Sequence, residues 1–169
     1  FKNLFRTLHY IHGGALARGA ENGSSATRTT LAAFGYATPA QDPRFALNFF
    51  ADTVKVDGRT LKQADGEALV YHPEAIRLQL TGSEYEKTAG ARMYKYEIDR
   101  TAYDDGNLQN NDIVLYRYAD ALLMRAEAQI RQGASGDAAL NAVRARVGLP
   151  ALSGATLEDV LKERLLELV

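Results

Sequence analysis

Residues 112–150 read DIVLYRYADALLMRAEAQIRQGASGDAALNAVRARVGLP, and residues 156–169 read TLEDVLKERLLELV. Apolar residues recur here at spacings of three and four, which is typical of amphipathic α-helices. The pattern predicts one helix from residue 112 to the glycine at 133, a second over 137–147 and a third after Thr156. Because only about four residues join the first two helices, we expect them to pack antiparallel.

Turn and cap residues mark the ends of these three helices. Either residue of the pair Asn111–Asp112 can cap the first helix, because a side-chain oxygen there accepts an unpaired backbone N–H. Gly133 and Gly148 can end the first two helices by adopting a left-handed conformation. Thr156 with Asp159 three residues later resembles a capping box. We expect Leu157, Val160, Leu161, Leu165 and Leu168 to form the apolar stripe of the third helix.

Residues 1–111 have no sustained helical period. The small residues of 13–30 predict a surface loop, and a short helix is expected over 30–36. Short strands are expected at 3–11, 45–56 and 93–98, with the second one closed by a hairpin turn at Asp57-Gly58. The sequence therefore predicts one mainly α piece over 1–169, loop-rich with a few short strands up to residue 111 and with TPR-like helical hairpins over 112–169. No fixed-period repeat is visible.

Composition excludes several classes of protein and site. The net charge of −1 gives no support to a nucleic-acid partner. The absence of cysteine excludes disulfides and thiolate metal sites. His9 and His12 would need one helix face to bind a metal, but the strand expected there points them to opposite sides, so we expect no metal and no cofactor. The acidic pairs Asp104-Asp105 and Glu84/Glu86 are the best acid–base candidates, and they are more typical of solvated loops, so we expect no enzyme.

Five motifs, in order along the chain, resemble those of one family. A signature R-Y-A-D-x-L-L-x-x-A-E-A is present at 117–128, followed by N-x-V-R-x-R-x-G-L-P at 141–150 and E-R-x-x-E-L at 163–168. Upstream are Asp-Pro-Arg-Phe at 42–45 and Tyr-Lys-Tyr at 94–96. Together they resemble the C-terminal region of the SusD/RagB family of nutrient-binding outer-membrane lipoproteins.

The resemblance implies a non-catalytic glycan- or nutrient-binding component of a TonB-dependent uptake system. Its partners would be a SusC-like TonB-dependent transporter and an oligo- or polysaccharide, and its place the extracellular face of the outer membrane. Family members are several hundred residues long and begin with a lipoprotein signal and cysteine. We therefore expect a fragment, the inner part of the C-terminal half, without the lipid anchor. A TPR-like protein-interaction module is the alternative.

Tyrosines are the ligand-binding candidates, because sugar C–H faces stack on aromatic rings and the chain has nine tyrosines and no tryptophan. Tyr36, Tyr71 and Tyr85 are expected in loops, whereas Tyr116 and Tyr118 are expected in the helical core. The charged residues of the signature are interpreted as a structural network that fixes the register of the helices, with an anion or substrate site as the other possibility. These structural residues are Arg117, Asp120, Glu127, Asn141, Arg144, Arg146, Glu163 and Arg164.

Overall fold

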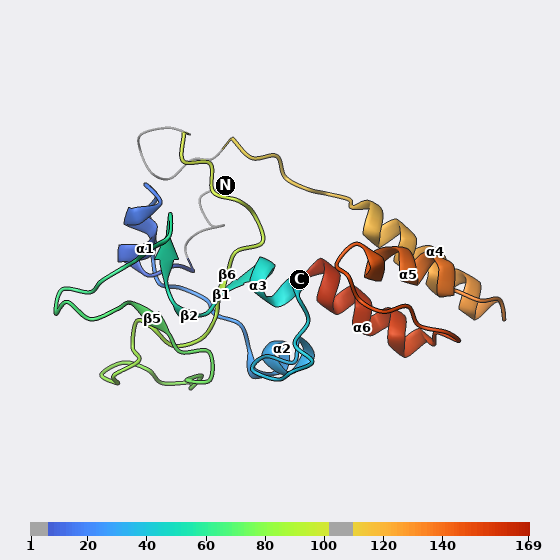
Figure 1. Cartoon of the computed structure of the whole chain (residues 1–169), viewed down its shortest axis with the longest axis horizontal. Helices are drawn as coiled ribbons and strands as arrows, with labels where there is room; N and C mark the ends of the chain where they lie inside the picture. The colour runs from blue at the N-terminus through green and yellow to red at the C-terminus, as the bar shows by residue number, and fades with distance from the viewer. Residues whose placement is uncertain (1–6, 102–109) are drawn as a thin grey trace. The chain divides into compact units, whose positions relative to one another are not determined.

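The computed structural model describes residues 7–101 and 110–169 (Figure 1). The chain forms two compact units. Unit 1 comprises residues 1–36 and 45–111, and unit 2 comprises 37–44 and 112–169. The segment 37–44, which the sequence placed in the loop-rich half, thus belongs to the helical unit.

Unit 2 is built from three helices that lie side by side (Figure 1). They are α4 (Tyr118–Arg131), α5 (Asp137–Ala145) and α6 (Leu157–Leu168). Their buried core consists of Leu123, Ala126, Ala139, Leu140, Val143 and Val160. The alanines allow the helix backbones to approach closely, which is the role that small residues have in packed helices.

Hydrogen bonds show how these helices run. Arg117, next to the start of α4, donates to the carbonyl oxygen of Glu167 near the end of α6 (2.6 Å). The carboxylate of Asp137, at the start of α5, accepts the N–H groups of Gly154 and Ala155 just before α6 (2.9 and 2.8 Å). Helix α4 is therefore antiparallel to α6, and α5 begins at the same end as α6. The TPR-like character of the helical hairpin formed by α4 and α5 stays a prediction.

The predicted turn chemistry is present in unit 2. Gly133 adopts a left-handed φ of 76° after α4. At Gly136 a Cβ atom would lie 2.8 Å from the carbonyl oxygen of Ala126, so only glycine allows this approach of α5 to α4. Thr156 and Asp159 form the complete capping box at the start of α6. Local sequence signals thus define these ends correctly.

The predicted start of the first helix is wrong. Helix α4 begins at Tyr118, and its N-cap Arg117 makes no side-chain capping bond. Residues 113–116 are exposed and have no helical structure, with Tyr116 89 % and Tyr118 80 % exposed. The run of adjacent apolar residues at 113–115 favours extended backbone, and no core residue of unit 2 covers it. The placement of Tyr116 and Tyr118 in the core is therefore also wrong.

The predicted apolar stripe of the third helix is only partly correct. Val160 is buried, but Leu161 and Leu165 are 69 % and 42 % exposed. The buried face of α6 continues instead through Glu163, Leu166 and Glu167. Paired carboxylates replace apolar side chains on this face, which a hydrophobic pattern alone does not show.

Unit 1 has short elements separated by long loops. Its helices are α1 (Tyr10–Ala15), α2 (Arg28–Ala33) and α3, which spans Arg44–Asn48 and so starts in unit 2. Three antiparallel pairs of two-residue strands are described: β1 (Phe49–Phe50) with β6 (Arg92–Met93), β2 (Asp52–Thr53) with β5 (Val70–Tyr71), and β3 (Lys55–Val56) with β4 (Arg59–Thr60). The Asp57-Gly58 hairpin turn is confirmed, with positive φ at both residues.

Several local predictions for unit 1 are wrong. Residues 45–48 are helical, and the rest of the strand predicted over 45–56 is interrupted, because Asp52 has a left-handed φ of 58°. Helix α1 replaces the end of the strand predicted over 3–11, while residues 3–6 lie outside the described residues. Of the strand predicted at 93–98, only Met93 belongs to one, at the end of β6. Tertiary contacts override weak strand preference in each place.

The core of unit 1 combines apolar clusters with buried polar side chains. Leu16 and Ala26 are buried although the sequence placed them in a surface loop, and α2 begins within that loop at Arg28. The buried guanidinium of Arg92 donates to the carbonyl oxygens of Thr7 and Lys87 (3.0 and 3.1 Å). Backbone carbonyls of loops are thus held from inside the unit. No helix in the described part of the chain is long and apolar enough to cross a membrane.

Candidate functional site

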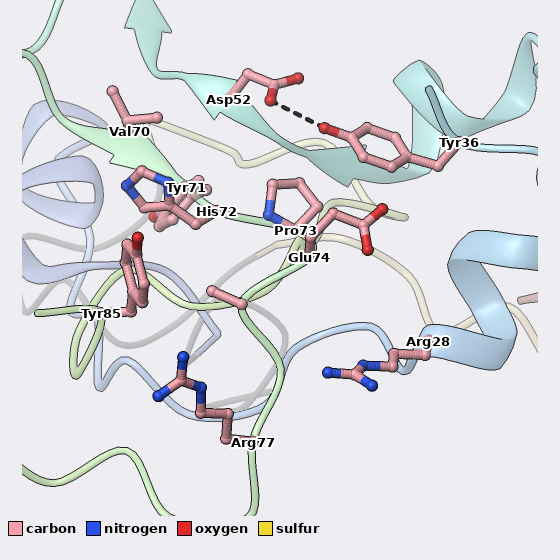
Figure 2. A pocket seen from close by; sticks show the side chains of 11 residues that line it. Arg28, Tyr36, Asp52, Val70, Tyr71, His72, Pro73, Glu74, Arg77 and Tyr85 are labelled. Carbon is pink, nitrogen blue, oxygen red and sulfur yellow. Dashed lines mark hydrogen bonds between the residues drawn. The ribbon is translucent and has the colours of Figure 1, made fainter. Parts of the chain in front are cut away.

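Unit 1 contains an open cavity of about 440 Å³ (Figure 2). The three candidate tyrosines, Tyr36, Tyr71 and Tyr85, all line it. The other lining residues are Arg28, Asp52, Val70, His72, Pro73, Glu74, Ala75 and Arg77. Residues separated by up to about 60 positions in the chain therefore meet around one space, in a unit whose regular structure is sparse.

Tyr36 lies at one end of the cavity. Its hydroxyl donates to Oδ1 of Asp52 (2.9 Å), which Figure 2 shows as a dashed line. Its ring packs on Phe45 at 4.9 Å between centroids, and Phe45 stacks on the buried Phe49. Burial, and then the hydrogen bond to Asp52, raise the pKa of Tyr36 to about 12. The ring is thus a fixed, neutral aromatic surface at neutral pH.

Tyr85 and His72 form a second aromatic group. Their ring centroids are 4.8 Å apart, and both side chains are only partly buried. The backbone holds His72 in place, because its N–H donates to the carbonyl oxygen of Thr88 and its carbonyl accepts from Gly90 (2.9 and 2.8 Å). A hydrogen bond with Glu84 is the main reason that the pKa of Tyr85 lies above its ordinary value. A partly exposed ring backed by a second ring is a suitable surface for stacking.

Tyr71 differs from the other two tyrosines because it is fully buried. Its hydroxyl accepts the N–H of His9 (2.8 Å) and lies 3.1 Å from Nδ1 of His12. The guanidinium of Arg92 lies over its ring at 5.1 Å from the centroid. Because the ring is buried, it supports the cavity wall and has no exposed face on which a ligand could stack.

Four charged side chains border the cavity, and all are exposed: Arg28, Asp52, Glu74 and Arg77. Arg28 donates to the carbonyl oxygen of Ile76 (3.1 Å), which fixes its guanidinium at the rim. Asp52 is engaged by Tyr36. Among the described residues, no carboxylate forms an ion pair with Arg28 or Arg77. The cavity thus offers aromatic surface, hydrogen-bond acceptors and unneutralised donors together.

The structure corrects the picture of His9 and His12. Both belong to the start of α1, where His9 is the N-cap and accepts the N–H of Ile11 (3.2 Å). Burial lowers the pKa of His12 to about 4, so its imidazole is neutral at pH 7. Within residues 7–101 and 110–169, no group of three or more His, Cys, Asp or Glu side chains is placed to hold a metal ion. Of the acid–base candidates, Asp104 and Asp105 lie outside the described residues.

Arg44 is the centre of a buried ion-pair network in unit 2. Its guanidinium is 2.7 Å from Asp42, 2.6 Å from Glu163 and 3.2 Å from Glu167, and all four side chains are at most 8 % exposed. Burial alone would raise the pKa of Glu167, but hydrogen bonds from Arg146 and Arg44 outweigh it and hold that pKa below its ordinary value. The network therefore joins the segment 37–44 to α6.

Four of the predicted structural residues, Arg117, Arg144, Arg146 and Glu163, belong to this network. Glu167 also binds Arg117 (2.7 Å) and Arg146 (2.8 Å), and Glu163 also binds Arg144 (3.0 Å). Two further contacts are separate from the network: Arg164 binds Asp120 (2.7 Å), and the amide of Asn141 donates to and accepts from the backbone of Leu152 (both 2.8 Å). Glu127 differs, because it pairs with Arg131 on its own helix and so does not join helices.

The sequence did not identify the central residues of either region. Arg44 was seen only as part of an Asp-Pro-Arg-Phe element, since its partner Glu163 is 119 positions away. Asp52, His72, Glu74 and Arg77 were not identified as cavity residues. The one local sign of the cavity is the run of aromatic, imidazole and acidic side chains at 71–74.

Comparison with known proteins identifies the family. The sequence model of the SusD family matches residues 20–169. A crystal structure of a SusD-like protein from Bacteroides fragilis matches with a TM-score of 0.50 and 18 % sequence identity, over 97 % of this chain and 37 % of that one. No curated protein matches the sequence. The chain spans well under half of that relative, and the likeness of the two structures concerns the fold. The match of the family model over most of its residues shows that this chain belongs to the SusD family.

Proposed function

We propose that this chain is part of a non-catalytic, glycan-binding component of nutrient uptake at the bacterial outer membrane. The observation that carries the proposal is membership of the SusD family over residues 20–169. In the proposed arrangement the protein lies on the extracellular face and passes its ligand to a SusC-like TonB-dependent transporter. The alternative, a TPR-like peptide-binding module, gains no support from the family match.

The cavity of unit 1 is the proposed sugar-contacting region of this chain. Tyr85, backed by His72, would stack on the apolar face of a sugar ring. Asp52 and Glu74 would accept hydrogen bonds from sugar hydroxyls, so that placed polar groups act together with the aromatic surface. Tyr36 and Tyr71 would keep the walls in position through Asp52 and His12. Binding in this form makes and breaks no covalent bond.

The proposal is tested with the full-length protein. Isothermal titration calorimetry against a panel of neutral and acidic polysaccharides measures binding, and co-purification measures association with the transporter. Loss of affinity in Tyr85→Ala is expected, whereas the matched change Tyr116→Ala, at an exposed tyrosine of unit 2, leaves it unchanged. Absence of both polysaccharide binding and transporter association would overturn the proposed function. If Tyr85→Ala and the unchanged protein have equal affinity, the cavity is not the sugar-contacting region.

A further inference from the structure

The charges around the cavity of unit 1 are separated from one another. At one end, Asp52 and Glu74 lie near Tyr36, and both carboxylates help to raise the pKa of that phenol, after burial. At the other end, Arg77 lies near Tyr85 and acts in the opposite sense to Glu84 on the phenol there. Figure 2 shows Arg28 and Arg77 on the side of the opening away from the Tyr36–Asp52 pair. Among the residues that line the cavity, the carboxylates thus lie at one end and the arginines on the other side, while Glu84, which is hydrogen-bonded to Tyr85, is not part of the lining.

The two arginines are also free to bind an anion. Elsewhere in the described chain, Arg44, Arg117, Arg144 and Arg164 each form an ion pair with a carboxylate, whereas the buried Arg92 donates to backbone carbonyls inside unit 1. Arg28 also has a backbone carbonyl as its hydrogen-bond acceptor, but it is exposed at the cavity, and its charge is unneutralised. Arg77 is exposed and lines the cavity, and no ion pair holds it among the residues described. A guanidinium with unused N–H groups at a concave surface is the usual partner of a carboxylate or a sulfate.

The carboxylates of the cavity leave room for such an anion. Asp52 is engaged by the Tyr36 hydroxyl at the far end, so its charge is directed toward that phenol. The stacking surface of Tyr85 and His72 lies on the side of Arg77. A sugar ring on this surface would therefore place one ring substituent near Arg77 and others near the acidic end, where hydroxyls can donate.

From this arrangement we infer that the cavity binds a sugar carrying an anionic substituent, a carboxylate or a sulfate group, which Arg77 recognises with the help of Arg28. The inference rests on the proposed glycan-binding function and deepens it by naming the ligand chemistry. Arg77 provides the direct contact, because its side chain forms no ion pair with any of the described residues. Arg28, anchored on Ile76, supplies a fixed second charge at the rim.

Paired oligosaccharides that differ only in charge test the inference in the full-length protein. Oligogalacturonate is compared with its methyl ester for the carboxylate, and κ-carrageenan oligosaccharide is compared with its desulfated form for the sulfate. We expect one anionic member to bind at least about tenfold more tightly than its neutral partner, with an affinity that falls as salt is raised. Which pair shows the difference identifies the anion.

Arg77→Gln locates the effect. We expect this variant to lose about tenfold in affinity for the anionic member and to bind the neutral partner unchanged. Arg59→Gln is the matched control, because it removes the same charge from an exposed residue of the same unit. Arg59 lies on β4, outside the cavity. Equal affinity within both pairs would overturn the inference, and so would an Arg77→Gln variant that binds the anionic member as tightly as Arg59→Gln does. In either case, binding of a neutral glycan would still support the proposed function. Binding of no glycan at all would also overturn the inference, and together with absence of transporter association it would remove the proposed function itself.

Discussion

The two units of this chain solve the problem of buried polar groups in different ways. In unit 2, charged side chains are buried together, and arginines and carboxylates neutralise one another across helices. In unit 1, the buried polar groups include Arg92, two histidines and the Tyr71 hydroxyl, and these bond to backbone atoms and to each other. The first solution fixes helices, whereas the second fixes loops.

This difference matches the proposed division of roles. Helices held by a charged network leave few side chains free for a ligand. Loops held from inside by their backbone can present Tyr85, His72 and Arg77 outward. The charged residues of the motifs at 117–168 and the proposed ligand-contacting residues thus lie in separate units of this chain.

The largest expected effect is in the network of unit 2. Arg44→Met removes the shared partner of Asp42, Glu163 and Glu167 and leaves buried carboxylates without full compensation. Breaking a buried ion pair from one side costs about 3–5 kcal/mol of unfolding free energy. Urea unfolding measures the change in unfolding free energy, and hydrogen exchange of the α6 amides locates it.

A surface ion pair of the same unit serves as the control. Arg131→Met removes the exposed pair with Glu127 on α4 and should cost less than about 0.5 kcal/mol. A cost for Arg44→Met as small as this would show that the network is dispensable, and the contrast between the two units would then lose its basis.

A smaller effect is expected from the tyrosine hydroxyl of unit 1. Tyr71→Phe leaves the buried N–H of His9 without its acceptor and removes the partner of His12. An unsatisfied buried polar group costs about 1–3 kcal/mol. Hydrogen exchange should show the loss in α1 and β5 and leave unit 2 unchanged. Tyr85→Phe, whose ring is partly exposed, should leave the stability of both units unchanged; loss of protection in unit 2 on Tyr71→Phe would contradict the assignment.

The same contrast explains what could be predicted from the sequence. The three helices of unit 2 were predicted because their period, glycine stops and capping box act over a few residues. Their first boundary was misplaced by six residues, from Asp112 to Tyr118, since an apolar run continues the helical period without a buried face to cover it. In α6, Glu163 and Glu167 are buried, whereas a hydrophobic pattern predicts that leucines such as Leu161 and Leu165 are buried instead.

Unit 1 depends on long-range contacts and was predicted less well. Phe45 to Val56 has strand composition, yet the aromatic packing of Phe45 with Phe34 and Phe49 stabilises a short helix at its beginning. Tyr36, Tyr71 and Tyr85 were selected only because sugars stack on aromatic rings, and in the structure all three line one cavity. No local pattern showed that Arg28 and Arg77 lie beside them, because tertiary contacts alone bring these segments together.

The response to acid should separate the two units. Burial lowers the pKa of His12 from 6.5 to about 4, so as pH falls through this range the unfolded chain gains a proton that the folded unit 1 does not. Unit 1 therefore loses stability as pH falls from 6.5 to 4, by up to about 1.4 kcal/mol per pH unit. The pKa of Glu167 is lowered instead, so unit 2 keeps its stability until the pH falls below the ordinary carboxyl value of 4.5.

Hydrogen exchange at pH 7 and pH 5, corrected for intrinsic rates, measures this response for each unit. Protection in α1 and β5 should decrease, and protection in α5 and α6 should stay constant. His12→Gln should abolish part of the difference between the two pH values, and the buried His9, whose pKa burial also lowers, should account for a further part. Equal loss of protection in both units at pH 5 would refute the assignment of the response to His12.

The smallest difference concerns two threonine caps, one in each unit. Thr156 forms a reciprocal capping box with Asp159 at the start of α6, and Thr27 caps α2 by accepting only the N–H of Thr30 from the backbone (3.2 Å). Thr156→Ala removes one side of the box and should cost about 1 kcal/mol. Thr27→Ala should cost less, because α2 is a six-residue helix whose buried residue is Leu31, and tertiary packing rather than its cap holds it. Exchange of the first-turn amides of α6 and α2 gives both values, and a cost for Thr27→Ala equal to or above that of Thr156→Ala would mean that local capping stabilises unit 1 as much as it stabilises unit 2.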